Sequence, residues 1–151
     1  MRTRLQEALK EAMRSKEARA VATVRLILAA LKDRDIAARS KGQMDGISDD
    51  EILSMLQSMI KQRRESIQLY EQGGRLELAE QESEEIAVIE RFLPRQMDDA
   101  EVAAAIDATL SALGAAGLKD MGRVMADLRE RFAGQMDFAK ASGLVKQKLQ
   151  G

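Results

Sequence analysis

The chain has 151 residues, with 24 basic and 25 acidic side chains and neither cysteine nor histidine. The missing cysteines exclude disulfides, thiolate catalysis and zinc–thiolate sites, and without histidine an acid–base enzyme would need a carboxylate or lysine with a strongly shifted pKa. The longest apolar run, residues 26–31, is far shorter than the roughly 20 residues that span a bilayer. We therefore expect a cytoplasmic protein without a membrane segment, without catalytic residues of its own, and without a metal ion or cofactor.

Strong helix formers dominate the composition, and no stretch alternates apolar and polar residues as strands do, so we predict an all-α fold. Two apolar stripes at helical spacing mark the first two helices: Leu5, Ala8, Leu9, Ala12 and Met13, and then Val21, Val24, Leu28 and Leu31 with Ile27 beside them. Two glycines make the segment 40–48 a loop. Ser48 and Glu51 have the spacing of a capping box, which predicts that the third helix begins there.

The third and fourth helices are expected to form a hairpin that turns at Gly73 and Gly74. The third helix carries an inward stripe that runs from Ile52 to Tyr70, and the fourth carries Leu78, Ala79, Ile86, Ile89 and Leu93.

Charged residues of this hairpin allow two interpretations. The segment 61–66, KQRRES, suits phosphate contact, but we favour pairing of its cations with the acidic segment 80–85. Glu82 falls on the apolar face of the fourth helix. We expect it to form a structural ion pair with Arg25, Arg63 or Arg75 rather than to act as a catalytic carboxylate.

Pro94, the only proline, separates long helices from short ones. Proline disfavours helical geometry at the preceding residue, so the fourth helix should end at Leu93. Asp98 and Glu101 form a second capping-box pattern, which begins a helix over 99–113 that Gly114 closes. Further short helices are predicted within 119–132 and 138–149. We therefore expect an N-terminal long-helix domain over 1–94 and a small three-helix domain over 95–151.

The segment 117–125, GLKDMGRVM, combines glycines with basic residues. Lys119 and Arg123 are four residues apart, so on one helix they share a face, and Lys140 and Lys146 would add to it from the last helix. Such a basic tip suits contact with a phosphate backbone without base reading. Gly122 lets another backbone approach closely, and a tight contact between two helices explains it equally well.

Four stretches of the sequence resemble the GatB/YqeY family, and specifically its free-standing YqeY-like proteins. They are 8-ALKEAMRSKEA-18, 24-VRLILAALK-32, 60-IKQRRESIQLYEQGGRLELAEQESEEIAVIERFLPRQM-97 and 119-KDMGRVM-125. The central block is the most specific, with a basic helix, Gly-Arg, Leu-Ala-Glu-x-Glu and Phe-Leu-Pro-x-Gln. The resemblance implies an all-α fold with an N-terminal helical domain and a small C-terminal domain of three helices.

The resemblance extends to the helical tail of the B subunit of the glutamine-dependent aminoacyl-tRNA amidotransferase, which contacts tRNA. It implies a tRNA-associated accessory module, with tRNA and a tRNA-charging or amidotransferase protein as partners. It is carried in the tail by Lys119, Met121, Gly122, Arg123, Val124, Met125, Gly134, Asp137, Lys140, Val145, Lys146 and Leu149. The chain departs from the family in two places. It has Gln135 and Met136 where relatives have a basic and then a small residue, and Phe138 where they have glycine.

Two other functions remain open. One is a component of a carbon–nitrogen ligase that uses glutamine as the nitrogen donor and acts with partner subunits, as the family name implies. The other is a protein-interaction helix bundle, with Met44, Met97 and Met136 as exposed and adaptable contacts.

Overall fold

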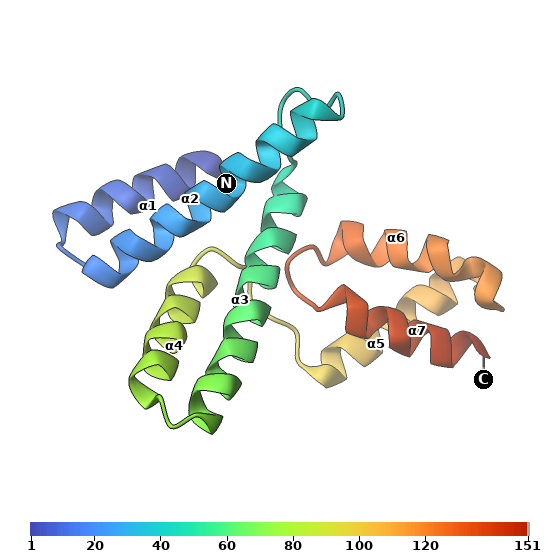
Figure 1. The fold of residues 1–151 in the computed structure, drawn as a ribbon. Coiled ribbons are helices and arrows are strands. Elements are labelled where there is room, and N and C mark those ends of the chain that lie inside the picture. Colours follow the sequence, from blue (N-terminus) through green and yellow to red (C-terminus); the bar gives the residue numbers. More distant parts are fainter. Residues whose placement is uncertain (151) are drawn as a thin grey trace. The chain divides into compact units, whose positions relative to one another are not determined.

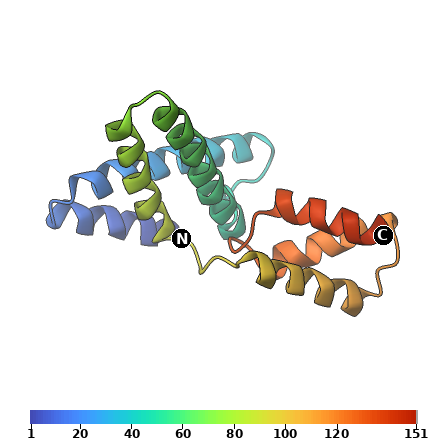
Figure 2. The same cartoon turned by 90° about the horizontal axis from the view of Figure 1, so that it is seen from below.

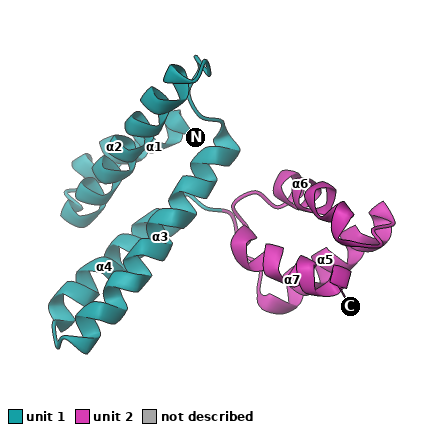
Figure 3. Ribbon diagram, turned by 45° about the vertical axis from the view of Figure 1, so that its right-hand side comes forward, with its two compact units in different colours: residues 1–93 teal, residues 94–151 magenta. Residues whose placement is uncertain are grey.

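In the computed structural model, which describes residues 1–150, all the regular elements are helices, as predicted. The chain divides into two compact units, which we call unit 1 (Met1–Leu93) and unit 2 (Pro94–Gly151) (Figure 3). That residues 1–94 and 95–151 are separate functional domains stays a prediction.

Unit 1 consists of two helical hairpins, α1 (Arg2–Arg14) with α2 (Ala18–Ser40), and α3 (Asp49–Gln72) with α4 (Leu76–Glu90) (Figure 1). The Ser48–Glu51 capping box is present and begins α3. Gly74 has a φ of +72°, the left-handed conformation expected where the α3–α4 hairpin turns. Helix α4 ends at Glu90, earlier than predicted, because Phe92 and Leu93 already make turn-type hydrogen bonds to Ile89 and Glu90.

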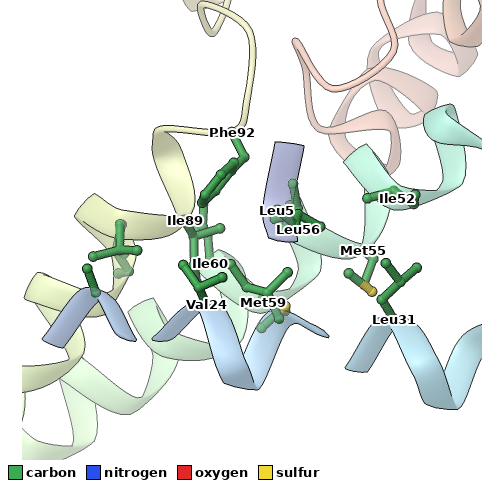
Figure 4. Packing of buried hydrophobic residues seen from close by; sticks show 14 of the residues in the cluster. Leu5, Val24, Leu31, Ile52, Met55, Leu56, Met59, Ile60, Ile89 and Phe92 are labelled. Atoms are coloured by element: carbon green, nitrogen blue, oxygen red, sulfur yellow. The ribbon is translucent and has the colours of Figure 1, made fainter. Parts of the chain in front are cut away.

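The core of unit 1 lies where α2 meets α4 and α3, with α1 covering one side (Figure 4). Its central side chains are almost fully buried: Leu5, Val24, Ile27, Ile52, Met55, Leu56 and Ile89. The buried side of α2 is rotated slightly from the side that the sequence predicted. Val21 and Leu28 are only partly buried, whereas Ala20 and Ile27 are buried. In α1, Met13 is exposed rather than inward.

A clamp at one end of unit 1 holds the loop that precedes α3. The Arg2 guanidinium donates to Asp35 Oδ1 at 2.6 Å and to the Ile47 carbonyl at 2.9 Å, and the Ile47 amide donates to the same Asp35 oxygen at 2.9 Å. Arg2 is the main reason that the pKa of Asp35 lies below its usual value. Gly46 lies against this clamp with a φ of +81°.

Unit 2 packs three short helices, α5 (Asp99–Leu113), α6 (Met121–Arg131) and α7 (Phe138–Gln150), around a small core. The Asp98–Glu101 capping box and the left-handed Gly114 bound α5 as predicted. A 3-10 turn, η1 (Leu118–Asp120), leads into α6. The most buried side chains are Ile106, Val124, Leu128, Ala141 and Val145.

Helices α5 and α7 run parallel. Lys140 pairs with Asp99, and Lys148 pairs with Asp107. The two partners are 41 residues apart in both pairs, so the two helices advance in the same direction. The end of α7 therefore lies near the end of α5. Figure 2 shows the start of α6 at this same end of unit 2, where η1 packs against α7.

Candidate functional site

The loop that leads into α6 is held by one carboxylate. Asp120 accepts hydrogen bonds from the amides of Ala116 at 2.9 Å and Gly117 at 3.3 Å, and its other oxygen accepts from Arg123 at 2.9 Å. The Ala116 hydrogen bond is the largest cause that holds the pKa of Asp120 below its ordinary value. This loop, and the η1 turn that follows it, therefore have a defined geometry.

Lys119 and Arg123 are both exposed, but they do not form the regular pair that was predicted. Lys119 lies in the 3-10 turn and Arg123 in α6, so the spacing of a single α-helix does not apply to them. Arg123 is bound to Asp120, which neutralises part of its charge. Lys119 forms no salt bridge with a described residue.

Lys140 and Lys146 lie on different sides of α7. Lys140 pairs with Asp99 of α5 at 3.1 Å. Lys146 follows six residues later, which at ~100° per residue places it about 120° away around the helix. Lys146 is exposed and, among residues 1–150, has no salt-bridge partner. Of the predicted cations, Lys119 and Lys146 are therefore the two whose charge is free, and they come from elements that pack against each other.

Gly122 is exposed near the start of α6, and a Cβ built on it would meet nothing within 4 Å. The alternative of a close helix–helix contact within the chain is therefore wrong. The space beside this backbone is open, which leaves it accessible to a partner.

The segment around Gln135 and Met136 is folded inward. Gln96 donates to the Gly134 carbonyl at 2.6 Å, and the Met97 amide donates to the Gln135 carbonyl at 2.9 Å. Met136 is 2% exposed. This segment holds the start of α5 and offers no cation, so the candidate surface is confined to η1, α6 and the end of α7.

The predicted set of exposed methionines is wrong in part. Met44 is 71% exposed, but Met136 is buried and Met97 packs partly buried against the core of unit 2. Nothing in the sequence pattern distinguishes them, because Met97 and Met136 lie in short connections without helical periodicity.

The charged cluster of unit 1 is structural. Arg63 Nε lies 3.0 Å from Glu85 Oε2 and 3.8 Å from Glu82 Oε2. The expected ion pair of Glu82 is therefore confirmed, and of the three arginines that the sequence left open its partner is Arg63. Glu85, not Glu82, is the more buried carboxylate, and its Oε1 also lies 3.9 Å from Arg19 Nη1. Burial and then the neighbouring charge of Glu85 raise the pKa of Glu82. Arg64 pairs with Glu90, so the 61–66 cations largely serve the α3–α4 contact.

An open cavity of about 380 Å³ lies between the α1–α2 hairpin and α4 in unit 1. Its floor is apolar, with Ala12, Val24 and Phe92, and Arg4 covers the Phe92 ring at 5.4 Å. Its charged lining residues are the carboxylates Glu7, Glu11 and Glu17 and the arginines Arg4 and Arg91. No group of three or more potential metal ligands occurs in the described part of the chain. No single helix of residues 1–150 is long and apolar enough to cross a bilayer; α5 and Leu118–Arg131 meet that test only as a bent pair.

Comparison with known proteins gives one family and a few relatives. The family model described as Yqey-like protein matches residues 2–149. Proteins of Candida glabrata and Eremothecium gossypii, both named altered inheritance of mitochondria protein 41, mitochondrial, are each 34% identical over 89 residues, 59% of this chain. An uncharacterized protein of Schizosaccharomyces pombe is 27% identical over 90 residues, 60% of this chain and 69% of its own length. The match spans about half the length of the first two relatives, at 47% and 46%.

Proposed function

The chain belongs to the family of YqeY-like proteins, and from that premise we propose that it is a cytoplasmic, tRNA-associated accessory module without catalysis of its own. In this proposal unit 2 contacts the phosphate backbone of tRNA through Lys119 and Lys146, with Arg123 and the open backbone at Gly122 nearby in α6. Lys140 lies at the start of α7 and would add a more distant contact. tRNA is the RNA class that the resemblance to the amidotransferase tail implies.

The observation that carries the proposal is the pair of free cations at the η1–α7 end of unit 2. Lys119 and Lys146 are exposed and form no salt bridge with described residues. A phosphate can therefore bind either lysine without first displacing a carboxylate. Arg123 and Lys140 would have to exchange Asp120 and Asp99 for a phosphate, so they should contribute less.

The rigid loop supports the same proposal. Because Asp120 holds the Ala116 and Gly117 amides, Lys119 projects from an ordered turn rather than from a mobile loop. Less conformational entropy is then lost on binding. Few phosphate contacts still predict weak affinity that falls steeply with salt.

The test is binding of the purified protein to total tRNA, measured by fluorescence anisotropy across a salt series, with a random RNA of equal length for comparison. Lys119→Glu combined with Lys146→Glu should lower tRNA affinity by about tenfold or more and reduce the slope of log K against log salt by about 2.

The matched control is Lys10→Glu in α1, an exposed lysine of unit 1 that also lacks a salt bridge within residues 1–150. It makes the same charge change as either Lys119→Glu or Lys146→Glu alone, the single variants to which it is compared, and should leave binding nearly unaltered. Equal effects of the control and of the Lys119 and Lys146 changes would contradict the site. Wild-type binding no tighter than to the random RNA would contradict the tRNA function.

A further inference from the structure

The outward side of α2 carries a second apolar stripe that no other part of the described chain covers. Leu26 is 48% and Ile36 51% exposed. Ala22, Ala29 and Asp33 are exposed with them, and the five positions are spaced by four, three, four and three residues. This is the spacing of a heptad seam, by which one helix packs lengthwise against another.

A row of basic residues follows one side of this seam. Arg25, Lys32 and Arg39 recur every seven residues and are exposed. In heptad terms they occupy the g position, where charges set the choice of a partner helix. None forms a salt bridge with residues 1–150, and Arg39 donates only to the Met44 carbonyl, at 3.2 Å.

We propose that the outward side of α2 docks an α-helix of a protein partner, and that this helix carries an apolar seam flanked by aspartate or glutamate. Leu26 and Ile36 would lose their exposure to water in the seam, and the three cations would pair with the acidic flank. Asp33 interrupts the seam. A single polar residue at such a position fixes the register, so the partner should place a basic residue opposite it.

A second copy of this chain is a poor occupant. In an antiparallel pair of α2 helices the two g rows face each other, which would set Arg25, Lys32 and Arg39 against the same cations. In a parallel pair they would face the e positions, which are Thr23, Ala30 and Ala37 and carry no charge. Neither arrangement satisfies the basic row.

RNA is also disfavoured on this side of α2. Phosphates would bind the basic row but would leave Leu26 and Ile36 exposed to water, so the apolar half of the surface would have no role. The proposal uses unit 1 alone and does not depend on tRNA binding by unit 2.

The test uses two synthetic helical peptides of about three heptads with the same leucine and isoleucine seam and one lysine opposite Asp33. One has glutamate at every e and g position and the other has lysine there, so that each peptide repels its own copies. The full chain should bind the acidic-flanked peptide at least about tenfold more tightly than the basic-flanked one, by fluorescence anisotropy.

Two variants define the surface. Leu26→Gln with Ile36→Gln should abolish binding of the acidic-flanked peptide. Leu69→Gln with Leu76→Gln, at more exposed positions in α3 and α4 on either side of their turn, should not. Arg25→Glu with Lys32→Glu should reverse the preference between the two peptides. All four positions of the α2 variants are exposed, and unchanged circular dichroism confirms folding. No peptide preference, or a preference that these variants leave unchanged, would overturn the proposal.

Because the chain has no cysteine, Ala29→Cys places one photoreactive maleimide in the middle of the seam. The acidic-flanked peptide should form a crosslink at this position. A crosslink to a second copy of the chain, or to tRNA added in place of the peptide, with none to the peptide, would overturn the proposal in favour of that occupant.

Discussion

Unit 1 and unit 2 place their charge pairs in different surroundings. In unit 1, Asp35 and Glu85 are 8% and 7% exposed, and each lies against an arginine from another helix. In unit 2, every salt bridge among the described residues has at least one side chain that is about half exposed or more. Changes at these two buried pairs of unit 1 should therefore act on stability, whereas changes of charge in unit 2 should act chiefly on binding.

The difference has a physical cause. Unit 1 packs long helices side by side within each hairpin, and charges buried between these helices must be paired because an unpaired buried charge is costly. Unit 2 packs short helices around a small apolar core. Among its described residues, 94–150, the buried polar side chain is Thr109, which donates back to the Ala105 carbonyl. The charged side chains of unit 2 stay in contact with water, where a salt bridge adds at most about 1 kcal/mol to the free energy of unfolding.

Gly46→Ala should have the largest effect. A Cβ at this position would lie 2.3 Å from Asp35 Oδ1, an oxygen that Arg2 and the Ile47 amide already hold, and the φ of +81° adds backbone strain. We expect a loss of ~3 kcal/mol in the free energy of unfolding of unit 1. Hydrogen exchange of unit 1 amides, together with urea denaturation, measures it.

The control for that change is Gly42→Ala. Gly42 also has a positive φ, +93°, but a Cβ there meets nothing within 4 Å. Only backbone strain remains, which costs about 1–2 kcal/mol. Equal losses for the two variants would show that the contact with Asp35 is unimportant.

Arg63→Met comes next in size. It leaves Glu82 and Glu85 without the guanidinium between them, although Arg19 remains 3.9 Å from Glu85. A loss of ~2 kcal/mol is expected for unit 1, since removing one partner of a buried pair leaves a charge that Arg19 compensates only in part. Arg64→Met breaks the exposed pair with Glu90 and should cost less than about 1 kcal/mol. If chemical denaturation gives similar losses for both, the contrast between buried and exposed pairs does not hold in unit 1.

Gly122→Ala separates stability from binding in unit 2. Alanine fits the open space beside α6 and favours the helix, so unit 2 should gain about 0.5–1 kcal/mol. The added methyl group covers the backbone that the proposed tRNA contact uses, so tRNA affinity should fall. Gly143→Ala in α7, another exposed glycine with open space, should give a similar rise in Tm with unchanged tRNA affinity. Equal tRNA affinity of the two variants would remove Gly122 from the proposed site.

Local signals predicted the start of α3 and both ends of α5. The capping boxes at Ser48 and Asp98 and the left-handed Gly114 are confirmed, because each depends on a few neighbouring residues. The phase of α2 was harder to predict. This helix has apolar residues on all sides, so the pattern cannot distinguish the buried Ile27 from the exposed Leu26 and Ile36. Only packing against α1 and α4 decides which side is inward.

Tertiary packing also decided the candidate site. The four predicted cations are equivalent in sequence, yet Asp120 holds Arg123 and Asp99 holds Lys140, while Lys119 and Lys146 remain unpaired. Asp99 lies 41 residues from Lys140, so no local pattern reveals that pair. Likewise, helical periodicity placed Glu82 inward, but contacts with Arg63 and Arg19 favour Glu85 as the more buried carboxylate.

The smallest predicted effect is the pH dependence that Glu82 introduces into unit 1. Glu82 faces Glu85 of its own helix and Arg63 of α3, and its pKa in the folded protein is raised above the ordinary 4.5 by burial and by Glu85. The folded state therefore holds this proton more tightly than the unfolded state does. Its stabilising contribution is complete below about pH 4.5 and is lost as the pH rises through the raised pKa.

Glu82→Gln removes this titration. The variant and the wild type should be equally stable near pH 4, and the variant should become the more stable of the two as the pH rises toward 7, by less than about 1 kcal/mol. Urea denaturation at a series of pH values measures the difference. A stability difference for Glu82→Gln that is constant, or that shrinks toward pH 7, would contradict the raised pKa. It would mean that Arg63 alone balances the negative charges of Glu82 and Glu85.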